Sequence, residues 1–139
     1  MAKLSPSGDH LWSTYLGGSF EDQGFGGIAV DAAGNALVVG WTYSPGWVSG
    51  GFDTSLDGES DAFVAKPSAT GGHLWSSYLG GTERDRGYGI AVDAVGNALV
   101  TGETKSAGWV SGGFDTTYNG GEGEYLGDAF VARITIEAT

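Results

Sequence analysis

The chain has 139 residues, no cysteine, and seventeen acidic against six basic residues, which gives a formal net charge of −11. This balance argues against binding to a nucleic-acid backbone, where lysine and arginine displace counterions, and a chain without cysteine has neither disulfides nor thiolate sites. No apolar run approaches the roughly 20 residues that cross a bilayer, and the first ten residues lack the apolar core of an export signal. We therefore expect no nucleic-acid partner and no membrane partner, and the compartment stays open.

Short apolar runs bounded by turn-forming residues dominate the chain. Glycine occurs 27 times, and no stretch has apolar residues at helical spacing over three turns. Runs of four or five apolar residues between Gly, Asn, Asp and Pro are typical of strands that are buried on both faces. The expected fold class is all-β.

One unit of about sixty residues occurs twice in the sequence. LWSTYLGG at 11–18 returns as LWSSYLGG at 74–81, IAVDAAGNALVVG at 28–40 as IAVDAVGNALVTG at 90–102, GWVSGGFDT at 46–54 unchanged at 108–116, and DAFVAK at 61–66 as DAFVAR at 128–133. The offset is 63 residues for the first segment, 62 for the next two and 67 for the last. The length changes fall in glycine-rich stretches, where loops absorb insertions at small cost.

The predicted strands follow this repeat along the chain. They lie at 11–16, then at 27–30, 36–42, 62–65 and 74–79, and again at 89–92, 98–104 and 129–134. Between the strands at 27–30 and 36–42, Asp31 favours the opening position of a tight turn and the following Gly-Asn supplies the positive φ that closes such hairpins. The same turn recurs at 93–97.

Side-chain size increases across each unit. The strand at 27–30 holds Gly, Ala, Ile and Val, whereas the strand at 74–79 holds Leu, Trp and Tyr. A sheet that is narrow at one edge and bulky at the other is a wedge, and wedges stacked around an axis form a propeller. Each unit is therefore predicted to be a four-stranded antiparallel propeller blade.

The segments LWSTYLGG, GFGGIAVDAAGNALVVGWT and SDAFVAK together resemble the SBBP beta-propeller repeat of bacterial proteins, over nearly the whole chain and twice. GWVS at 46–49 and its copy depart from the Asp-Phe-Pro-like segment that is usual there. The resemblance implies a propeller and brings no catalytic residues. It suggests a bacterial parent and leaves open an extracellular location, as well as whether the chain is a natural piece of a longer array or an engineered one.

The predicted strands do not divide evenly into blades. The blade at 27–79 is complete, the blade at 89–134 lacks a fourth strand, and a spare copy of that strand is present at 11–16. Two blades cannot close a ring, since propellers have typically 4–8. We expect homo-oligomers in which strand 11–16 of one chain completes blade 89–134 of the next. A six-bladed ring of three chains is favoured over an eight-bladed ring of four. The expected interface residues are Leu11, Trp12, Tyr15, Leu16, Phe130, Val131 and Ile134.

The main alternative is a multivalent, lectin-like module that binds carbohydrate. Trp47 and Phe52, with their copies Trp109 and Phe114, lie on long glycine-rich loops where they could stack on a sugar ring. Packing of these aromatic side chains over the blade edge is favoured, because buried aromatic residues outnumber exposed ones.

A weaker hypothesis concerns a metal ion. Asp57, Glu59 and Asp61 alternate along the chain and are a weak candidate set for Ca²⁺. A solvated acidic loop is the favoured interpretation, since the second unit does not keep the spacing.

No catalytic constellation is evident in the sequence. His10 and His73 occupy equivalent positions before Leu-Trp without a common partner, and no G-x-S-x-G segment is present. We therefore expect a structural, self-assembling protein that is not an enzyme and has no cofactor.

Overall fold

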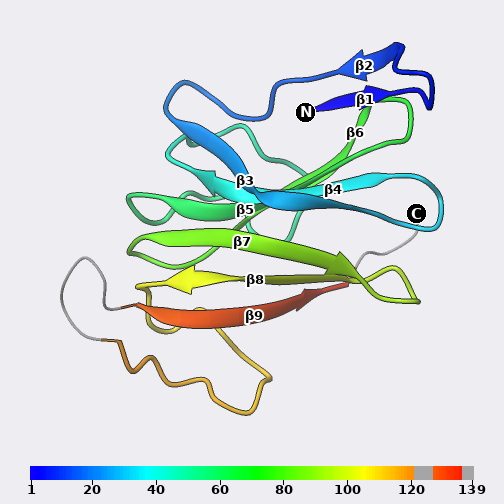
Figure 1. Ribbon diagram of the computed structural model, residues 1–139. Coiled ribbons are helices and arrows are strands. Elements are labelled where there is room, and N and C mark those ends of the chain that lie inside the picture. Colours follow the sequence, from blue (N-terminus) through cyan, green and yellow to red (C-terminus); the bar gives the residue numbers. More distant parts are fainter. Residues whose placement is uncertain (121–126, 136–139) are drawn as a thin grey trace.

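All regular structure in the computed structural model, which describes residues 1–120 and 127–135, is β-strand (Figure 1). The strands are β1 (Ala2–Leu4), β2 (His10–Ser13), β3 (Asp22–Val30), β4 (Ala36–Thr42), β5 (Asp61–Pro67), β6 (His73–Leu79), β7 (Asp85–Val92), β8 (Ala98–Thr104) and β9 (Asp128–Ile134). The all-β prediction is confirmed. Within the described ranges there is accordingly no helix that is long and apolar enough to cross a membrane.

The strands form three antiparallel sheets, ordered β1-β2, β3-β4-β5-β6 and β7-β8-β9. Strands adjacent in sequence are adjacent in each sheet. The β3–β4 turn follows its sequence, because the Asp31 carboxylate accepts the backbone N–H groups of Ala33 and Asn35 at 3.0 and 2.9 Å. Gly34 has a φ of 85°, which a side chain would disfavour. The β7–β8 turn repeats this pattern.

The first strand of each larger sheet is longer than the sequence pattern predicts. β3 begins at Asp22 rather than at residue 27, and β7 begins at Asp85 rather than at residue 89. The pairing register shifts between Gln23 and Gly27, and again between Gly87 and Gly89. A bulge of glycines interrupts the apolar alternation that marks a strand, so the preceding residues do not look like strand in the sequence.

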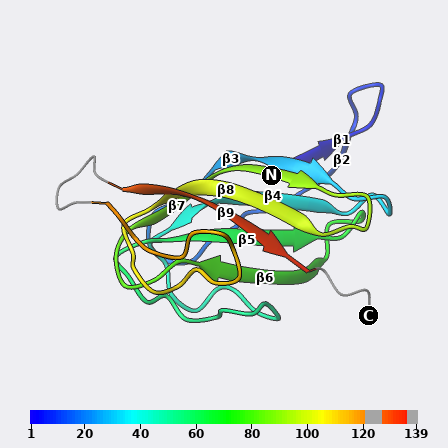
Figure 2. The same ribbon diagram turned by 90° about the horizontal axis from the view of Figure 1, so that it is seen from below.

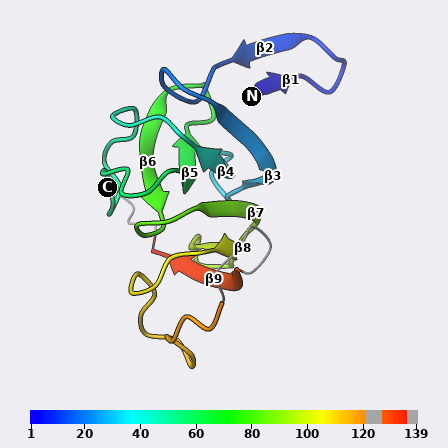
Figure 3. The same ribbon diagram turned by 90° about the vertical axis from the view of Figure 1, so that its left-hand side faces the viewer.

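The two larger sheets pack face to face over the main core (Figures 1 and 3). The core contains Leu37, Val39 and Val64 from one sheet and Val100 and Phe130 from the other. β3 and β7 lie side by side, whereas β6 and β9 form the outer edges. The stack therefore has a narrow side at β3 and β7.

Glycine permits this close approach. A Cβ placed on Gly87 would lie 2.5 Å from a methyl carbon of Val39, and one placed on Gly26 would lie 2.5 Å from the carbonyl oxygen of Gly87. Larger side chains at these positions would push the sheets apart on their narrow side.

The two outward faces of the stack carry exposed apolar residues whose repeat counterparts belong to or pack against the core between the sheets. On the β3–β6 sheet, Ile28 and Val30 are exposed, but their counterparts Ile90 and Val92 pack against the core between the sheets. On the β7–β9 sheet, Val131 is 75% exposed, whereas its counterpart Val64 is completely buried. Each outward face of the stack therefore carries the residue types that form one side of the contact between the two sheets.

Candidate functional site

In the complete sheet, β6 is held along both of its edges. One edge pairs with β5, and the other receives hydrogen bonds from the segment that follows β4. The backbone N–H groups of Ser76 and Tyr78 donate to the carbonyl oxygens of Ser49 and Asp53, both at 2.8 Å. The fourth strand of the blade therefore lies in a slot between β5 and residues 49–53.

The other sheet contains the same slot without a strand in it. β9 pairs with β8 along one edge only (Figure 2), and the loop that corresponds to 49–53 lies apart from its other edge (Figures 1 and 3). A cavity of about 290 Å³ lies between them, lined mainly by residues 113–118 and 128–131. We call this cavity the open slot.

A tryptophan anchors the loop of each slot against its sheet. The Trp109 indole N–H donates to Thr104 Oγ1 at 2.9 Å, and its ring meets Phe130 edge-on at a centroid distance of 5.0 Å. Trp47 makes the same two contacts, with Thr42 Oγ1 at 3.0 Å and with Phe63 at 5.0 Å. The loop and the sheet that border the open slot are therefore held together by the same contacts as those that border the filled slot.

The predicted ligand-binding aromatic residues separate into two kinds. Trp47 and Trp109 are half-buried and hold the slot loops, as described above. Phe52 and Phe114 are 66% and 107% exposed. The tryptophans thus have the packing role that the sequence favoured for this loop, while the phenylalanines lie on the surface.

The segment 11–16 has the sequence of β6 but different surroundings. Tyr78 in β6 is completely buried, and its hydroxyl group donates to the Ser44 carbonyl oxygen at 2.6 Å. Its counterpart Tyr15 is fully exposed. Leu79 is buried and its counterpart Leu16 only half-buried, whereas Leu11 and Leu74 are both about half exposed. Relative to their counterparts in β6, Tyr15 and Leu16 therefore have the most additional surface that a new contact could bury.

A short strand from the start of the chain pairs with one edge of this segment. The strand β2 ends at Ser13, three residues before the predicted end, and it pairs with β1 of the same chain. Its register, Ala2 opposite Ser13, repeats that of Ala65 opposite Ser76 in the complete blade. β1 therefore pairs with the same edge of β2, and in the same register, as β5 does with β6. Residues 1–3, MAK, align with residues 64–66, VAK, so comparison of the two repeats indicates this pairing.

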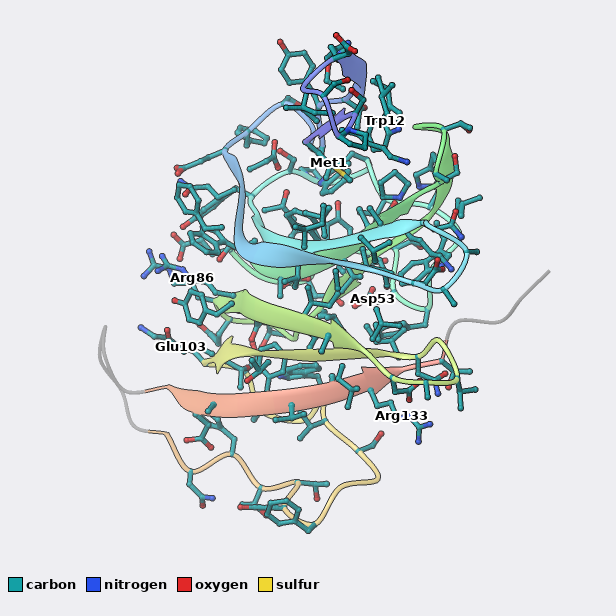
Figure 4. All side chains as sticks on the ribbon, turned by 45° about the vertical axis from the view of Figure 1, so that its right-hand side comes forward. Met1, Trp12, Asp53, Arg86, Glu103 and Arg133 are labelled. Atoms are coloured by element: carbon teal, nitrogen blue, oxygen red, sulfur yellow. The ribbon has the colours of Figure 1, made fainter. Side chains whose placement is uncertain are left out.

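The β1–β2 hairpin rests on the β5–β6 turn (Figure 4). The Trp12 indole N–H donates to the Ala69 carbonyl oxygen at 3.0 Å, and Lys3 Nζ donates to the same oxygen at 3.2 Å. Met1 packs against the outward face of the β3–β6 sheet beside Phe63. The hairpin therefore covers part of the face that carries Ile28.

Of the candidate calcium ligands, Asp57 and Glu59 are exposed and Asp61 is buried. Glu59 faces Arg84 at 3.8 Å, whereas Asp61 is completely buried and accepts the Asp57 backbone N–H at 3.4 Å. Among residues 1–120 and 127–135, no group of three or more His, Asp or Glu side chains is placed to hold a metal ion.

Asp61 instead meets a second buried carboxyl group, Asp85, at the contact between the two sheets. The Asp85 backbone N–H donates to the Ser60 carbonyl oxygen at 2.9 Å, and both side chains are completely buried. Burial raises the pKa of Asp61 to about 8 and also raises the pKa of Asp85. The strand pattern did not predict this pair, although DQG at 22–24 aligns with DRG at 85–87, and Asp61 with Asp128.

Two stretches of the chain match a family model described as the SBBP beta-propeller repeat, at residues 11–46 and 74–108. Each match runs from the LWSxYLGG segment through the glycine bulge and the first hairpin to the start of the slot loop. No curated protein matches the chain. Since the two matches together cover half of the chain and fall on the repeated strands, the chain belongs to the SBBP beta-propeller repeat family.

Proposed function

We propose that this protein is a structural, self-assembling propeller module without catalytic activity. Residues 11–16 of one chain enter the open slot of the next, and three chains close a six-bladed ring, with four chains and eight blades as the second choice. The observation that carries this proposal is the open slot itself, which repeats around β9 the groove that holds β6. Assembly is the role that this feature supports best.

The hydrogen bonds of the filled slot support a specific pairing between copies. By repeat equivalence, the backbone N–H groups of Ser13 and Tyr15 would donate to the carbonyl oxygens of Ser111 and Asp115 in the next copy. The Tyr15 hydroxyl group would reach the carbonyl oxygen of Ser106, the counterpart of Ser44. Tyr15 would be buried as Tyr78 is, and a buried aromatic side chain removes roughly 150–250 Å² from water.

Blade stacking supports the same assembly. The exposed Ile28 and Val30 of one copy would meet the outward face of the next copy's β7–β9 sheet, which carries Val131. Their counterparts Ile90, Val92 and Val64 are already packed at the internal contact between the sheets. Head-to-tail repetition of one contact generates a closed ring when the rotation between copies closes.

Assembly requires β1 to leave β2, because β9 and β1 pair with the same edge. β1 has three residues, all of them exposed, whereas β9 offers seven. The exchange therefore replaces a short, solvated pairing with a longer and more buried one. Tyr15 and Leu16 lie beyond the pairing of β1 with β2, so they are suited to make the first contact with the slot.

Cross-linking tests this arrangement directly, since the chain has no cysteine of its own. In the complete blade Val64 lies opposite Ser77, so Val131 should lie opposite Thr14 of the next copy. The double variant Thr14→Cys, Val131→Cys, treated with a short thiol cross-linker, should give a ladder on a denaturing gel that ends at the ring size.

The two single variants are the matched controls, because one cysteine per chain cannot link more than two chains. A double variant that stays at the mass of one chain, or that gives no more than the single variants, would reject strand exchange.

A further inference from the structure

We infer that ring closure builds, at every contact between chains, a buried pair of carboxyl groups, Asp128 of one copy and Asp22 of the next, which share one proton. This inference rests on the proposed ring and concerns its control. Assembly would then take up protons and be favoured in acid.

The contact between the two sheets of one chain provides the template. Asp61 begins β5, Asp85 begins β7, and neither side chain is accessible to solvent. The backbone hydrogen bond from Asp85 to Ser60 holds the two residues side by side. Two carboxylates cannot both remain charged at such a site, because burial and mutual repulsion each disfavour the second charge.

The hydrogen bonds indicate which carboxyl group carries the proton. Asp85 accepts from the Thr104 hydroxyl group, from the Ser106 hydroxyl group at 3.0 Å and from the Gly81 backbone N–H at 3.0 Å. These donors suit a carboxylate. Asp61 Oδ1, in contrast, is buried and accepts no hydrogen bond from the described residues. A proton on this oxygen would make it a donor to the Asp85 carboxylate and remove the unsatisfied group.

Both halves of a second pair are present at the two ends of the stack. Asp22 has the same three partners as Asp85: the Thr42 hydroxyl group, the Ser44 hydroxyl group at 3.2 Å and the Gly18 backbone N–H at 3.1 Å. Asp128 accepts the Asn119 backbone N–H at 2.8 Å, as Asp61 accepts that of Asp57. In a single chain Asp22 and Asp128 are half-buried and begin β3 and β9, which belong to different sheets. Head-to-tail contact would join them as Asp85 and Asp61 are joined.

The charged groups near the template favour protonation. Burial is the main cause that raises the pKa of Asp61 to about 8, and the like charges of Asp85, Asp53 and Asp57 act in the same direction. The neutral hydroxyl group of Tyr78 is the group that faces Asp61 from β6. Arg84, just before β7, faces Glu59 instead.

The second pair would lie in similar surroundings. Asp115 and Asn119, in the same chain as Asp128, correspond to Asp53 and Asp57. Tyr15, in the same chain as Asp22, corresponds to Tyr78. On the described chain, Tyr118 also faces Asp128 and the carboxylates of Glu83, Asp85 and Glu103. One neighbouring carboxylate is replaced by the neutral Asn119, and the other like charges remain.

Linkage gives the sign of the effect. In separate chains Asp22 and Asp128 begin strands of different sheets and have no contact through which to share a proton, whereas each contact in the ring would hold one shared proton. Where the ring binds one more proton than the separate chains, the dissociation constant of a contact rises about tenfold per pH unit. The dissociation constant stops rising above the pH at which the ring loses the shared proton.

The test is sedimentation velocity from pH 5.5 to 9.5 in buffer with EDTA, on the unmodified protein and on Asp128→Asn. The unmodified ring should weaken about tenfold per pH unit over part of this range. The asparagine amide can donate to Asp22 without a proton, so Asp128→Asn should assemble independently of pH and more tightly than the unmodified chain at high pH. Asp22→Asn repeats the test from the other partner.

The matched control is Asp61→Asn, the same change at the internal pair. It should remove the pH dependence of unfolding between about pH 4 and 8, where burial raises the pKa of Asp61, and leave the pH dependence of assembly unchanged. A ring whose stability does not change over the range, or an Asp128→Asn ring that keeps the full dependence, would overturn the inference while the ring itself stands. So would recovery at pH 9 by added Ca²⁺, since a cation would then replace the proton. Absence of any assembly at all pH values would reject the proposed function instead.

Discussion

Tyr15→Ala should dissociate the ring and leave the single chain as stable as before. In one chain this side chain is fully exposed and supports nothing, whereas in the ring it would fill the place that Tyr78 fills in the complete blade. Loss of a buried aromatic side chain costs about 3–5 kcal/mol, which corresponds to a rise of about a hundredfold to a thousandfold or more in the dissociation constant. Sedimentation velocity over a dilution series measures the change.

Tyr78→Ala is the matched comparison, because it removes the same side chain from the equivalent position. Tyr78 is buried within its own chain, so this variant should lose about 3–5 kcal/mol in the free energy of unfolding even in dilute, dissociated protein. Equal unfolding losses for the two variants in dilute protein would contradict the proposal. So would a Tyr15→Ala ring of unchanged stability.

Both Trp109→Ala and Trp47→Ala should weaken folding, and Trp109→Ala should in addition weaken assembly strongly. Each indole ties a slot loop to its sheet through a threonine hydroxyl group and a phenylalanine ring. Loss of a packed tryptophan costs about 3 kcal/mol or more. In Trp47→Ala this appears as lower unfolding stability, since the slot is already filled by β6 of the same chain. In Trp109→Ala the same loss frees the loop that borders the open slot, so the strand of another copy would bind less tightly.

The same two variants decide between assembly and carbohydrate binding. Both indole rings pack against phenylalanines of the sheet, so we expect neither variant to change sugar binding in a tryptophan-fluorescence titration or on a glycan array. Saturable binding that is lost in both variants, with mass and stability unchanged, would favour the lectin-like alternative. The exposed Phe52 and Phe114 would then be the next positions to change.

Comparison of the two repeats predicted the local structure well, because the residues that form the turns and the core occur in both copies. The Asp31 turn and the large core residues follow directly from short sequence patterns. The beginnings of β3 and β7 do not, since the glycine bulges before Gly27 and Gly89 break the alternation. Aromatic packing on the slot loop was correctly favoured for Trp47, but composition alone could not separate it from the exposed Phe52.

Contacts between distant segments were the hardest to predict. The alignment of residues 1–3 with 64–66 indicates the pairing of β1 with β2, but it does not show how this pairing competes with the one expected for β9. The contact of Asp61 with Asp85 depends on how the sheets stack, which the sequence of one blade does not record. Comparison of the two repeats could have identified the second contact, because both carboxyl groups recur at equivalent positions.

Native mass spectrometry of the unmodified protein at micromolar concentration and mildly acidic pH tests the proposed strand exchange most directly. Occupation of the slot around β9 by a second copy requires one closed species, at three times the 14.2 kDa of one chain, or at four times if the blades close at eight. A stable single chain of 14.2 kDa under these conditions, or a continuous series of sizes without a preferred number, would contradict it.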